Sequence, residues 1–101
     1  MAQFDIYKNN NFETAAEFPY LLDIQSDILS SLETRVVVPL RESVKAIQHL
    51  NPVFIIEQTP YILLIQELAG VHKSALGKKC GSLKEHRSEI IAALDFMVSG
   101  F

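Results

Sequence analysis

Cysteine and long apolar runs are both scarce in this sequence. Cys80 is the only cysteine, so no disulfide can form within the chain, which is typical of proteins in a reducing cytoplasm. The longest purely apolar runs are short, such as residues 61–65, whereas a membrane-spanning helix needs about 20 apolar residues. The start of the chain also lacks the basic and apolar regions of a signal peptide. We therefore expect a cytoplasmic protein that binds no membrane.

Motifs that would indicate catalysis or a bound cofactor are also missing. The three histidines are scattered without the spacing of metal ligands, and the four glycines form no phosphate-binding loop. Cys80 with a histidine as its base is the one candidate nucleophile, but an idle thiol is far commoner. We predict no cofactor, no metal site and no catalytic residue. The protein is expected to act by binding other proteins, not as an enzyme.

Positive charge is in short supply overall, because the net charge is −3. Non-specific DNA affinity comes from lysine and arginine neutralising phosphates, so the chain is not a general nucleic-acid binder. The charges are uneven, however. Residues 1–69 carry four basic and nine acidic side chains, and residues 70–101 carry five basic and three acidic ones. These five are Lys73, Lys78, Lys79, Lys84 and Arg87. They form either a solvated face or a docking strip for an acidic partner peptide.

Apolar residues are plentiful and make up 49% of the 101 positions, beside an ordinary charged fraction of 21%. This composition argues against disorder, and the length predicts one domain over residues 1–101. A chain of this size buries somewhat more than about 60% of the surface that it exposes when unfolded, so its core is thin. A partner that covers more apolar surface would stabilise it.

Five apolar segments with the period or residue types of β-strands predict a β-rich fold. They lie at residues 4–7, 22–25, 36–38, 53–56 and 61–65. The last two are almost wholly apolar, so we expect a hairpin at the centre of the sheet, covered on both faces. Pro39 has no backbone N–H to donate to a neighbouring strand, which predicts that it lies at the end of a strand or at a sheet edge. We also predict a mobile asparagine-rich loop at residues 8–17 and one or two helical turns at residues 41–50.

One helix is predicted near the C-terminus, over residues 83–98. Ser82 and Glu85 have the spacing of a capping box, in which each side chain bonds the other residue's backbone N–H. Gly100 predicts the end of the helix. The apolar stripe has helical spacing and consists of Ile90, Leu94 and Met97, widened by Ala93 and Phe96.

The end of this helix is apolar nearly all round. Ile91, Val98 and Phe101 lie outside the stripe, and Asp95 is the only charge from residue 90 onward. Such a helix is either sunk deep in a core or part of an interface. A thin core favours the interface, and we predict a dimer that involves this helix.

Six parts of the chain, taken together, match a known pattern. They are residues 22–28 (LDIQSDI), residues 35–40 (RVVVPL), residues 51–53 (NPV), His86-Arg87, residues 93–97 (ALDFM), and Gly100 followed by the bulky Phe101. Each part is weak alone, but they follow in order between residues 3 and 101. The set resembles the CcdB family, plasmid-maintenance toxins that poison DNA gyrase.

The resemblance implies a fold and a function. CcdB-like toxins are homodimers, mainly β, with a five-stranded antiparallel sheet, a small extra sheet and a C-terminal helix, in the CcdB/MazF-like (SH3-like barrel) fold. They are the toxins of type II toxin–antitoxin modules, bind the A subunit of gyrase and hold that enzyme on cleaved DNA. A CcdA-like antitoxin neutralises them. Toxin and antitoxin together repress their own operator, so the toxin meets DNA only indirectly.

The same resemblance implies two sets of contact residues. The gyrase contacts would be Ile28, Leu29, Asp95, Val98, Ser99, Gly100 and Phe101. The antitoxin contacts would be Lys8, Asn10, Phe12, Lys45, Ile47, Glu67 and Lys73. Ser99 departs from the family, whose plasmid toxin has tryptophan there, and an aromatic anchor often dominates interface energy.

Two other functions stay open. The related MazF toxins share this fold and cleave RNA, and fold alone does not decide function. Against RNA cleavage, the sequence shows no acid–base constellation. Ser99 leaves open a non-toxic relative that still binds an antitoxin.

Overall fold

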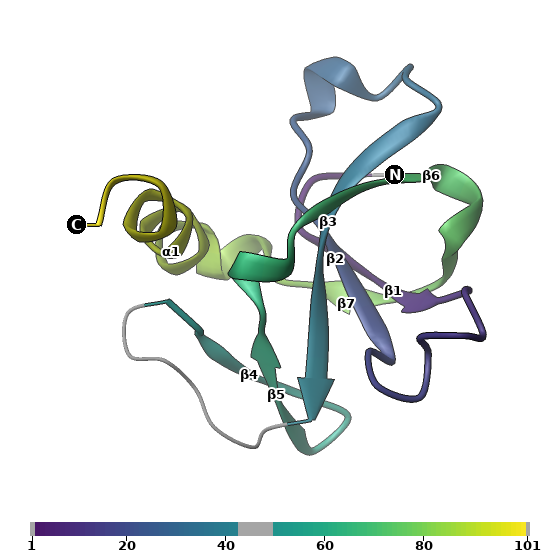
Figure 1. The fold of residues 1–101 in the computed structure, drawn as a ribbon, viewed down its shortest axis with the longest axis horizontal. Coiled ribbons are helices and arrows are strands. Elements are labelled where there is room, and N and C mark those ends of the chain that lie inside the picture. The colour runs from purple at the N-terminus through teal and green to yellow at the C-terminus, as the bar shows by residue number, and fades with distance from the viewer. Residues whose placement is uncertain (1, 43–49, 101) are drawn as a thin grey trace.

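The computed structural model describes residues 2–42 and 50–100, and Figure 1 shows their arrangement. Within these residues seven strands are formed: β1 (Asp5–Asn9), β2 (Tyr20–Asp23), β3 (Thr34–Glu42), β4 (Val53–Ile56), β5 (Thr59–Leu63), β6 (Ala69–His72) and β7 (Leu76–Ser82). Four short 3-10 turns lie between them or lead into the helix: η1 (Asp27–Leu29), η2 (Ile65–Glu67), η3 (Lys73–Ala75) and η4 (Lys84–His86). The helix α1 (Arg87–Ser99) comes last.

All seven strands join in one antiparallel sheet with the order β4-β5-β3-β2-β1-β7, and β6 pairs with β3 off this path. The strong right-handed twist of β-strands allows such a sheet to curl round its own core. The predicted class, mainly β with a C-terminal helix, is confirmed. The five predicted strands correspond to β1–β5. The sequence pattern missed β6 and β7, whose glycines and lysines are unusual in strands.

Pro39 lies inside the central strand β3, so the prediction of a strand end or a sheet edge is wrong. Residues 34–37 of β3 pair with β6, and residues 40–42 pair with β5. Pro39 lies between these two partners, and its carbonyl accepts a hydrogen bond from the Leu64 N–H (3.0 Å). In an antiparallel strand the N–H and C=O of one residue point to the same side. The missing N–H therefore faces the gap between β6 and β5 and breaks no bond to β2.

The predicted hairpin exists as β4 and β5, but its expected place at the sheet centre is wrong. β4 is an edge strand, and its side chains alternate between buried and exposed. Phe54 and Ile56 face the core, whereas Val53 and Ile55 are exposed to solvent. An unbroken apolar run therefore does not by itself distinguish a strand covered on both faces from an edge strand.

The main core fills the space between the curled sheet and α1. Its members come from β1–β5, η2, α1 and the residues Phe4 and Leu83 outside these elements. They include Leu22, Leu40, Leu63, Ile65 and Ile90, none of which has measurable exposure. Ile90 and Ala93 point from α1 into this core, and Leu94 and Met97 pack beside them. The predicted stripe is therefore the core-facing side of the helix.

The helix begins later than predicted, and the capping box does not form. Ser82 belongs to β7, and the buried Leu83 donates its N–H to the carbonyl of Phe4 (2.7 Å). This bond ties the segment to β1, so only the 3-10 turn η4 follows. The Ser82 hydroxyl accepts from the N–H of Lys84 (3.2 Å), not from that of Glu85. The α-helix starts at Arg87.

Candidate interaction surfaces

The exposed side of the last turn of α1 carries four of the predicted gyrase contacts. Asp95, Val98, Ser99 and Gly100 are all exposed, with 81% of the Val98 surface accessible. The Ser99 hydroxyl donates to the carbonyl of Asp95 (2.7 Å), so its polar group is already satisfied within the helix. The fifth contact, Phe101, lies outside the described residues.

The helix end is less apolar at its surface than the sequence suggested. Ile91, Leu94, Phe96 and Met97 are half-buried, and three of these four pack against the main core. Val98 is the one strongly exposed large apolar residue of α1 within residues 87–100. The exposed surface at the end of α1 is therefore a small apolar spot with polar neighbours. The dimer that involves this helix stays a prediction.

Gly100 closes the helix as predicted. Its φ of 80° lies in the left-handed region, and its N–H donates to the carbonyl of Phe96 (2.8 Å). A side chain at this φ is strained, so Gly100→Ala is expected to lower the free energy of unfolding by about 1 kcal/mol. Denaturant unfolding measures the change. No cost would mean that the helix end adopts another conformation in solution.

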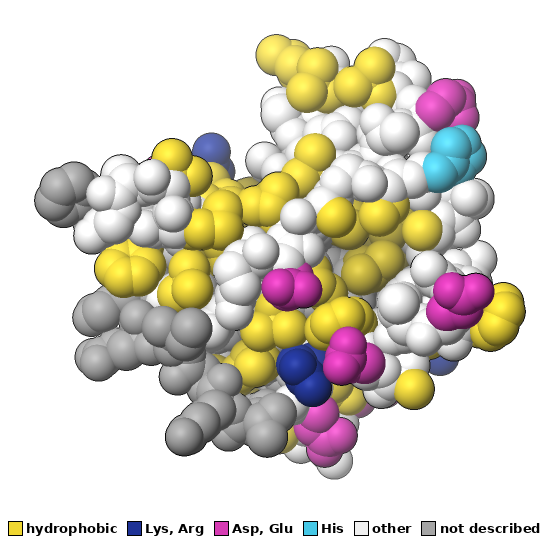
Figure 2. Space-filling view, viewed as in Figure 1, with side chains coloured by type: hydrophobic (Ala, Val, Ile, Leu, Met, Phe, Trp, Pro, Cys, Tyr) yellow, Lys and Arg dark blue, Asp and Glu magenta, His cyan; other side chains and the backbone are white. Residues whose placement is uncertain are grey.

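The other predicted gyrase contacts lie on a lobe between β2 and β3, residues 24–33. Ile28 is 84% exposed and Leu29 46% exposed. Leu32, which the sequence did not single out, is as exposed as Leu29 and completes an apolar tip. Figure 2 shows this tip at the top of the molecule, separated from α1 by a concave stretch. Exposed apolar clusters of this kind usually mark an interface.

A buried ion pair closes the base of this lobe. Asp23, at the end of β2, accepts from the Arg35 Nε–H (2.9 Å) and lies 2.6 Å from Nη2 of the same residue. Asp23 also accepts from the N–H of Gln25 (3.0 Å). The Gln25 side chain then donates to the carbonyl of Leu29 and accepts from the N–H of Val36. The lobe is thus held by side chains from within it and from both flanking strands.

The ion pair is almost fully desolvated, with exposures of 1% for Arg35 and 0% for Asp23. Burial raises the pKa of the Asp23 carboxyl, and the hydrogen bond from Arg35 opposes that rise. Tyr7 lies nearby, and its hydroxyl donates to Asp5 (3.3 Å). Burial and the Asp5 carboxylate raise the pKa of Tyr7. These groups lack the solvent access that a substrate would need, so we assign them a structural role.

A second surface is an apolar groove on the other face of the sheet, with a volume of about 170 Å³. Its walls come from residues 9–18 on one side and residues 67–75 on the other, and strands β2 and β3 form its floor. Leu21, Val37, Pro39 and Val71 supply apolar surface, and Glu67 lies among them. Sequence reasoning identified Glu67 but not the apolar floor, because β6 pairs with β3 only in the folded sheet.

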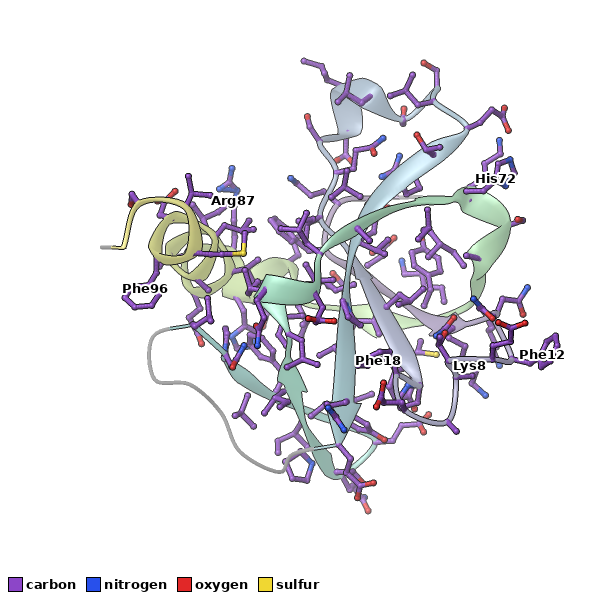
Figure 3. All side chains as sticks on the ribbon, in the orientation of Figure 1. Lys8, Phe12, Phe18, His72, Arg87 and Phe96 are labelled. Carbon is purple, nitrogen blue, oxygen red and sulfur yellow. The ribbon has the colours of Figure 1, made fainter. Side chains whose placement is uncertain are left out.

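Of the predicted antitoxin contacts within the described residues, only Glu67 lines this groove, while Asn10, Phe12 and Lys73 lie on the segments that form its walls. Lys8 and Phe12 lie on the same side of the molecule as His72, opposite Arg87 and Phe96 (Figure 3). Phe12 is 87% exposed, and Asn10 donates to the carbonyl of Ser74 (3.2 Å), which joins the two walls. Of the remaining contacts, Glu67 lines the groove and Lys73 pairs with Glu33 (3.5 Å). Lys45 and Ile47 lie outside the described residues, as does most of the predicted helical segment 41–50.

The asparagine-rich segment is closed by its own hydrogen bonds. Lys8 and Asn9 belong to β1, which shortens the predicted loop. Asn9 donates to the Thr14 hydroxyl (2.9 Å) and to the carbonyl of Phe18 (2.9 Å), and it accepts from the N–H of Asn11 (3.0 Å). Asparagine side chains thus replace the ladder bonds that a strand would supply.

The sequence predicts a poorly ordered loop at residues 8–14 without antitoxin, and because Lys8 and Asn9 belong to β1, this stays a prediction for residues 10–14. Their bonds are exposed, and the segment buries too little apolar surface to offset its chain entropy. Amide hydrogen exchange should be much faster there than in the core strand β2, and antitoxin should slow it. Exchange as slow as that of β2 in the free protein would contradict the prediction.

No group of three or more His, Cys, Asp or Glu side chains within residues 2–42 and 50–100 is placed to hold a metal ion. Over the same residues, no helix is long and apolar enough to cross a membrane. Cys80 is half-buried, and its thiol donates to the carbonyl of Lys78 (3.4 Å).

The curled sheet with its C-terminal helix is the fold of MazF-like and CcdB-like toxins. A solved endoribonuclease in complex with its cognate antitoxin, from Mycobacterial species, matches with a TM-score of 0.78 at 15% identity, over 97% of this chain and 94% of that one. The Mycobacterium tuberculosis toxin MazF-mt6 matches with a TM-score of 0.72 at 12% identity, over 90% and 92%. At such low sequence identities, the structural similarity establishes only that the fold is shared.

The family follows from the sequence itself. A family model described as CcdB protein matches residues 3–100, nearly the whole chain. The chain belongs to the CcdB family.

Proposed function

We propose that this protein is the toxin of a type II toxin–antitoxin module, which binds the A subunit of DNA gyrase and traps the enzyme on cleaved DNA. The observation that carries the proposal is the CcdB family match over residues 3–100. The structure supports it at the expected positions, because Val98 and Ile28 are both strongly exposed. An exposed apolar side chain gains binding energy only when a partner covers it.

The proposed active form is a homodimer, in which a two-fold toxin surface meets a two-fold target. We expect size-exclusion chromatography with light scattering to give the dimer mass at micromolar concentration. A monomer under those conditions would contradict this part of the proposal.

Gyrase poisoning has a direct test in vitro. Purified toxin, gyrase, ATP and supercoiled plasmid are incubated, and the reaction is stopped with detergent and protease. We expect linear DNA to accumulate with wild-type toxin and not with a gyrase altered at its toxin contact. In sensitive cells, expression should stop growth, and co-expression of the cognate antitoxin should restore it. Absence of trapped DNA breaks at saturating toxin would reject gyrase as the target.

The apolar groove is the proposed binding site of a CcdA-like antitoxin. An extended tail could place apolar side chains over Leu21, Val37 and Val71, between the two walls. With its antitoxin, the protein would also act as a corepressor that contacts DNA only through the complex. Mobility shift of the operator by the mixture, and not by the toxin alone, is the expected result.

Charge should also contribute to antitoxin binding. We expect the double charge reversal Lys45→Glu with Lys73→Glu to weaken binding about fivefold or more, since an acidic tail loses two attractive charges. Lys78→Glu is the control for one charge reversal away from the groove, because Lys78 is exposed on β7 and does not line the groove. Isothermal titration at low salt measures the affinities. Equal affinities for all three proteins would remove the electrostatic part of the proposal.

The second candidate is an endoribonuclease, which the fold of the solved neighbours favours. Beside the groove, the Arg41 guanidinium lies 5.8 Å from the ring centroid of Phe18 and 3.7 Å from the Glu17 carboxylate. This exposed cation and carboxylate already engage one another, which disfavours an acid–base role. Incubation with a long mixed-sequence RNA decides the matter. Cleavage that Arg41→Ala abolishes would establish the endoribonuclease, and intact RNA beside trapped gyrase would exclude it.

A further inference from the structure

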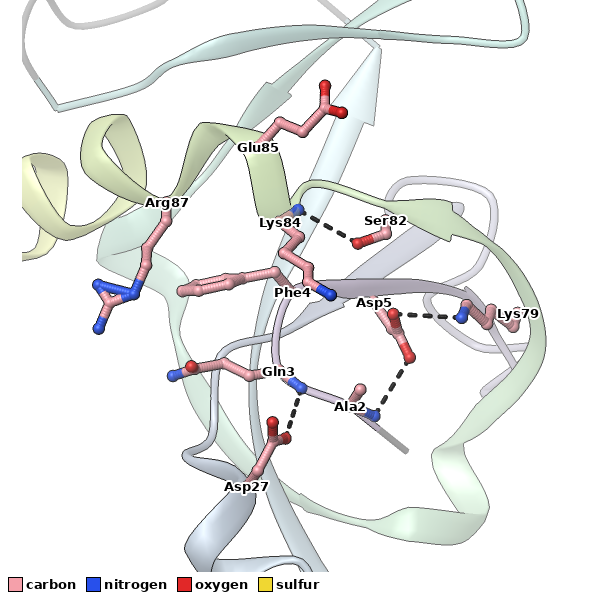
Figure 4. Close-up of a pocket in the computed structure, with 10 residues that line it drawn as sticks. All are labelled: Ala2, Gln3, Phe4, Asp5, Asp27, Lys79, Ser82, Lys84, Glu85 and Arg87. Atoms are coloured by element: carbon pink, nitrogen blue, oxygen red, sulfur yellow. Dashed lines mark hydrogen bonds and ion pairs between the residues drawn. The ribbon is translucent and has the colours of Figure 1, made fainter.

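The strand order of the sheet ends at β7 on one side and at β4 on the other. β7 is protected against pairing with another chain, because it carries two exposed lysines, Lys78 and Lys79. Lys79 pairs with Asp5 (3.4 Å) at a hollow lined by carboxylates and cations in equal number (Figure 4). Lysines on an edge strand disfavour the addition of a further strand, which would have to accommodate their charge.

The other outer strand, β4, has no such protection. Its four residues carry no charge and no proline, and they pair with β5 without a bulge. Figure 1 shows β4 beside β5 at this end of the sheet. Two of its apolar side chains face solvent, with exposures of 48% for Val53 and 67% for Ile55. An uncharged edge strand with exposed apolar side chains is a template for pairing with another strand.

The backbone of β4 presents its unpaired groups at the same two residues. The carbonyl of Pro52 accepts from the N–H of Leu63 (2.9 Å), so residue 52 is directed towards β5. This direction alternates along an antiparallel strand, so residues 54 and 56 also face β5, whereas Val53 and Ile55 face away. Pro60, opposite Ile55, fits this pattern because it has no N–H to donate. The N–H and C=O groups of Val53 and Ile55 therefore point to a side on which no strand lies within the described residues.

β4 is held in its extended form by the rest of the chain. Phe54 and Ile56 are buried in the main core, and the Phe54 ring lies 4.9 Å from the ring of His86. The turn to β5 consists of Glu57 and Gln58, with φ of 49° and 69°, and paired positive φ values match the twist of a hairpin. Because the strand is already ordered, it loses little conformational entropy when another strand pairs with it.

We propose that β4 pairs with β4 of a second copy of this chain, antiparallel and two-fold symmetric about Phe54. Val53 of each copy then lies opposite Ile55 of the other, and each such pair exchanges two N–H···O bonds. The exposed apolar side chains cover one another across the two strands. In this register Glu57 lies opposite Asn51 of the second copy, so no two carboxylates oppose each other.

A second copy suits this edge better than a free peptide does. A peptide must be ordered when it binds, whereas the second β4 is already extended. Two strands of this length cover less than the about 1,200 Å² that stable interfaces need, so the contact is weak, with a dissociation constant on the order of 100 µM. The contact includes none of the predicted gyrase contacts and is independent of the proposed function.

The test is sedimentation velocity at concentrations from well below to well above this dissociation constant. The mass of the wild-type protein should rise with concentration. Val53→Lys with Ile55→Lys places like charges opposite each other and should weaken the association at least about tenfold. Phe12→Lys with Ala16→Lys is the matched control, because both residues are exposed between β1 and β2, away from β4. The control should associate as the wild type does.

A mixture of two variants tests the register. Val53→Glu with Ile55→Glu should not associate with itself, but an equimolar mixture with the double lysine variant should associate, since each lysine then lies opposite a glutamate. If the wild type associates and the mixture does not, the two-fold register is wrong. A wild-type mass that stays constant over the range, or a double lysine variant that associates as the wild type does, would overturn the contact.

Amide hydrogen exchange measures the same contact in the unmodified protein. The N–H groups of Val53 and Ile55 should exchange more slowly as the protein concentration rises, whereas those of Phe54 and Ile56, which face β5, should not change. Exchange at Val53 and Ile55 that is independent of concentration would reject the proposal. If the cognate antitoxin slows this exchange and a higher protein concentration does not, the edge binds the antitoxin and the second copy is the wrong occupant.

Discussion

Replacing Asp23 by alanine is expected to lower the free energy of unfolding by about 3–5 kcal/mol. The variant leaves the guanidinium of Arg35, which is 1% exposed, without its counter-ion. Nη1 of Arg35 has no hydrogen-bond partner among the described residues, so no neighbour replaces the carboxylate. Denaturant unfolding followed by circular dichroism measures the loss.

Two further variants separate this effect from general damage. Asp95→Ala removes an exposed carboxylate from α1 and should change the free energy of unfolding by less than about 0.5 kcal/mol. The double variant Asp23→Leu with Arg35→Met removes both charges and should recover most of the stability, because the cost lies in the unpaired charge. A loss below about 1 kcal/mol for Asp23→Ala would show that solvent reaches the pair.

The same pair should matter for binding, since it closes the base of the lobe that carries Ile28 and Leu29. A variant that still folds without Asp23 would present these side chains on a looser loop. Such a loop would have to become ordered when it binds, which lowers the affinity, whereas the wild-type lobe is already ordered before binding.

Phe101→Ala is expected to weaken gyrase binding by about 2 kcal/mol, or about thirtyfold. A large aromatic side chain buries much apolar area at low entropy cost, and Ser99 offers no such area where the plasmid toxin has tryptophan. Ser99→Ala should be nearly silent, because the hydroxyl is exposed and bonds the carbonyl of Asp95. Titration with the gyrase A breakage–reunion fragment measures both.

The control for apolar truncation is Ile55→Ala, which removes a 67% exposed side chain from the edge strand β4. It should leave gyrase affinity unchanged, because β4 carries none of the predicted contacts. Full affinity after deletion of residues 99–101 would move the binding site elsewhere. No binding by the intact protein would favour the relative that binds only an antitoxin.

The sequence by itself determined those features that depend on near neighbours along the chain. Alternation and β-branched residues predicted β1–β5, since one buried face imposes a period of two on each strand. The spacing of Ile90, Leu94 and Met97 predicted the core side of α1, and Gly100 predicted its end, because only glycine enters the left-handed region freely. The order of short segments also predicted the family, which the match over residues 3–100 confirmed.

Only the tertiary structure decided which segments meet. β6 carries little strand pattern and forms because β3 offers it a partner, and that exchange of partners is also why Pro39 is tolerated in a central strand. The helix starts at Arg87 because Leu83 bonds Phe4, a residue far away in sequence. The apolar groove and the Asp23–Arg35 pair depend on such long-range contacts, which local propensity does not encode.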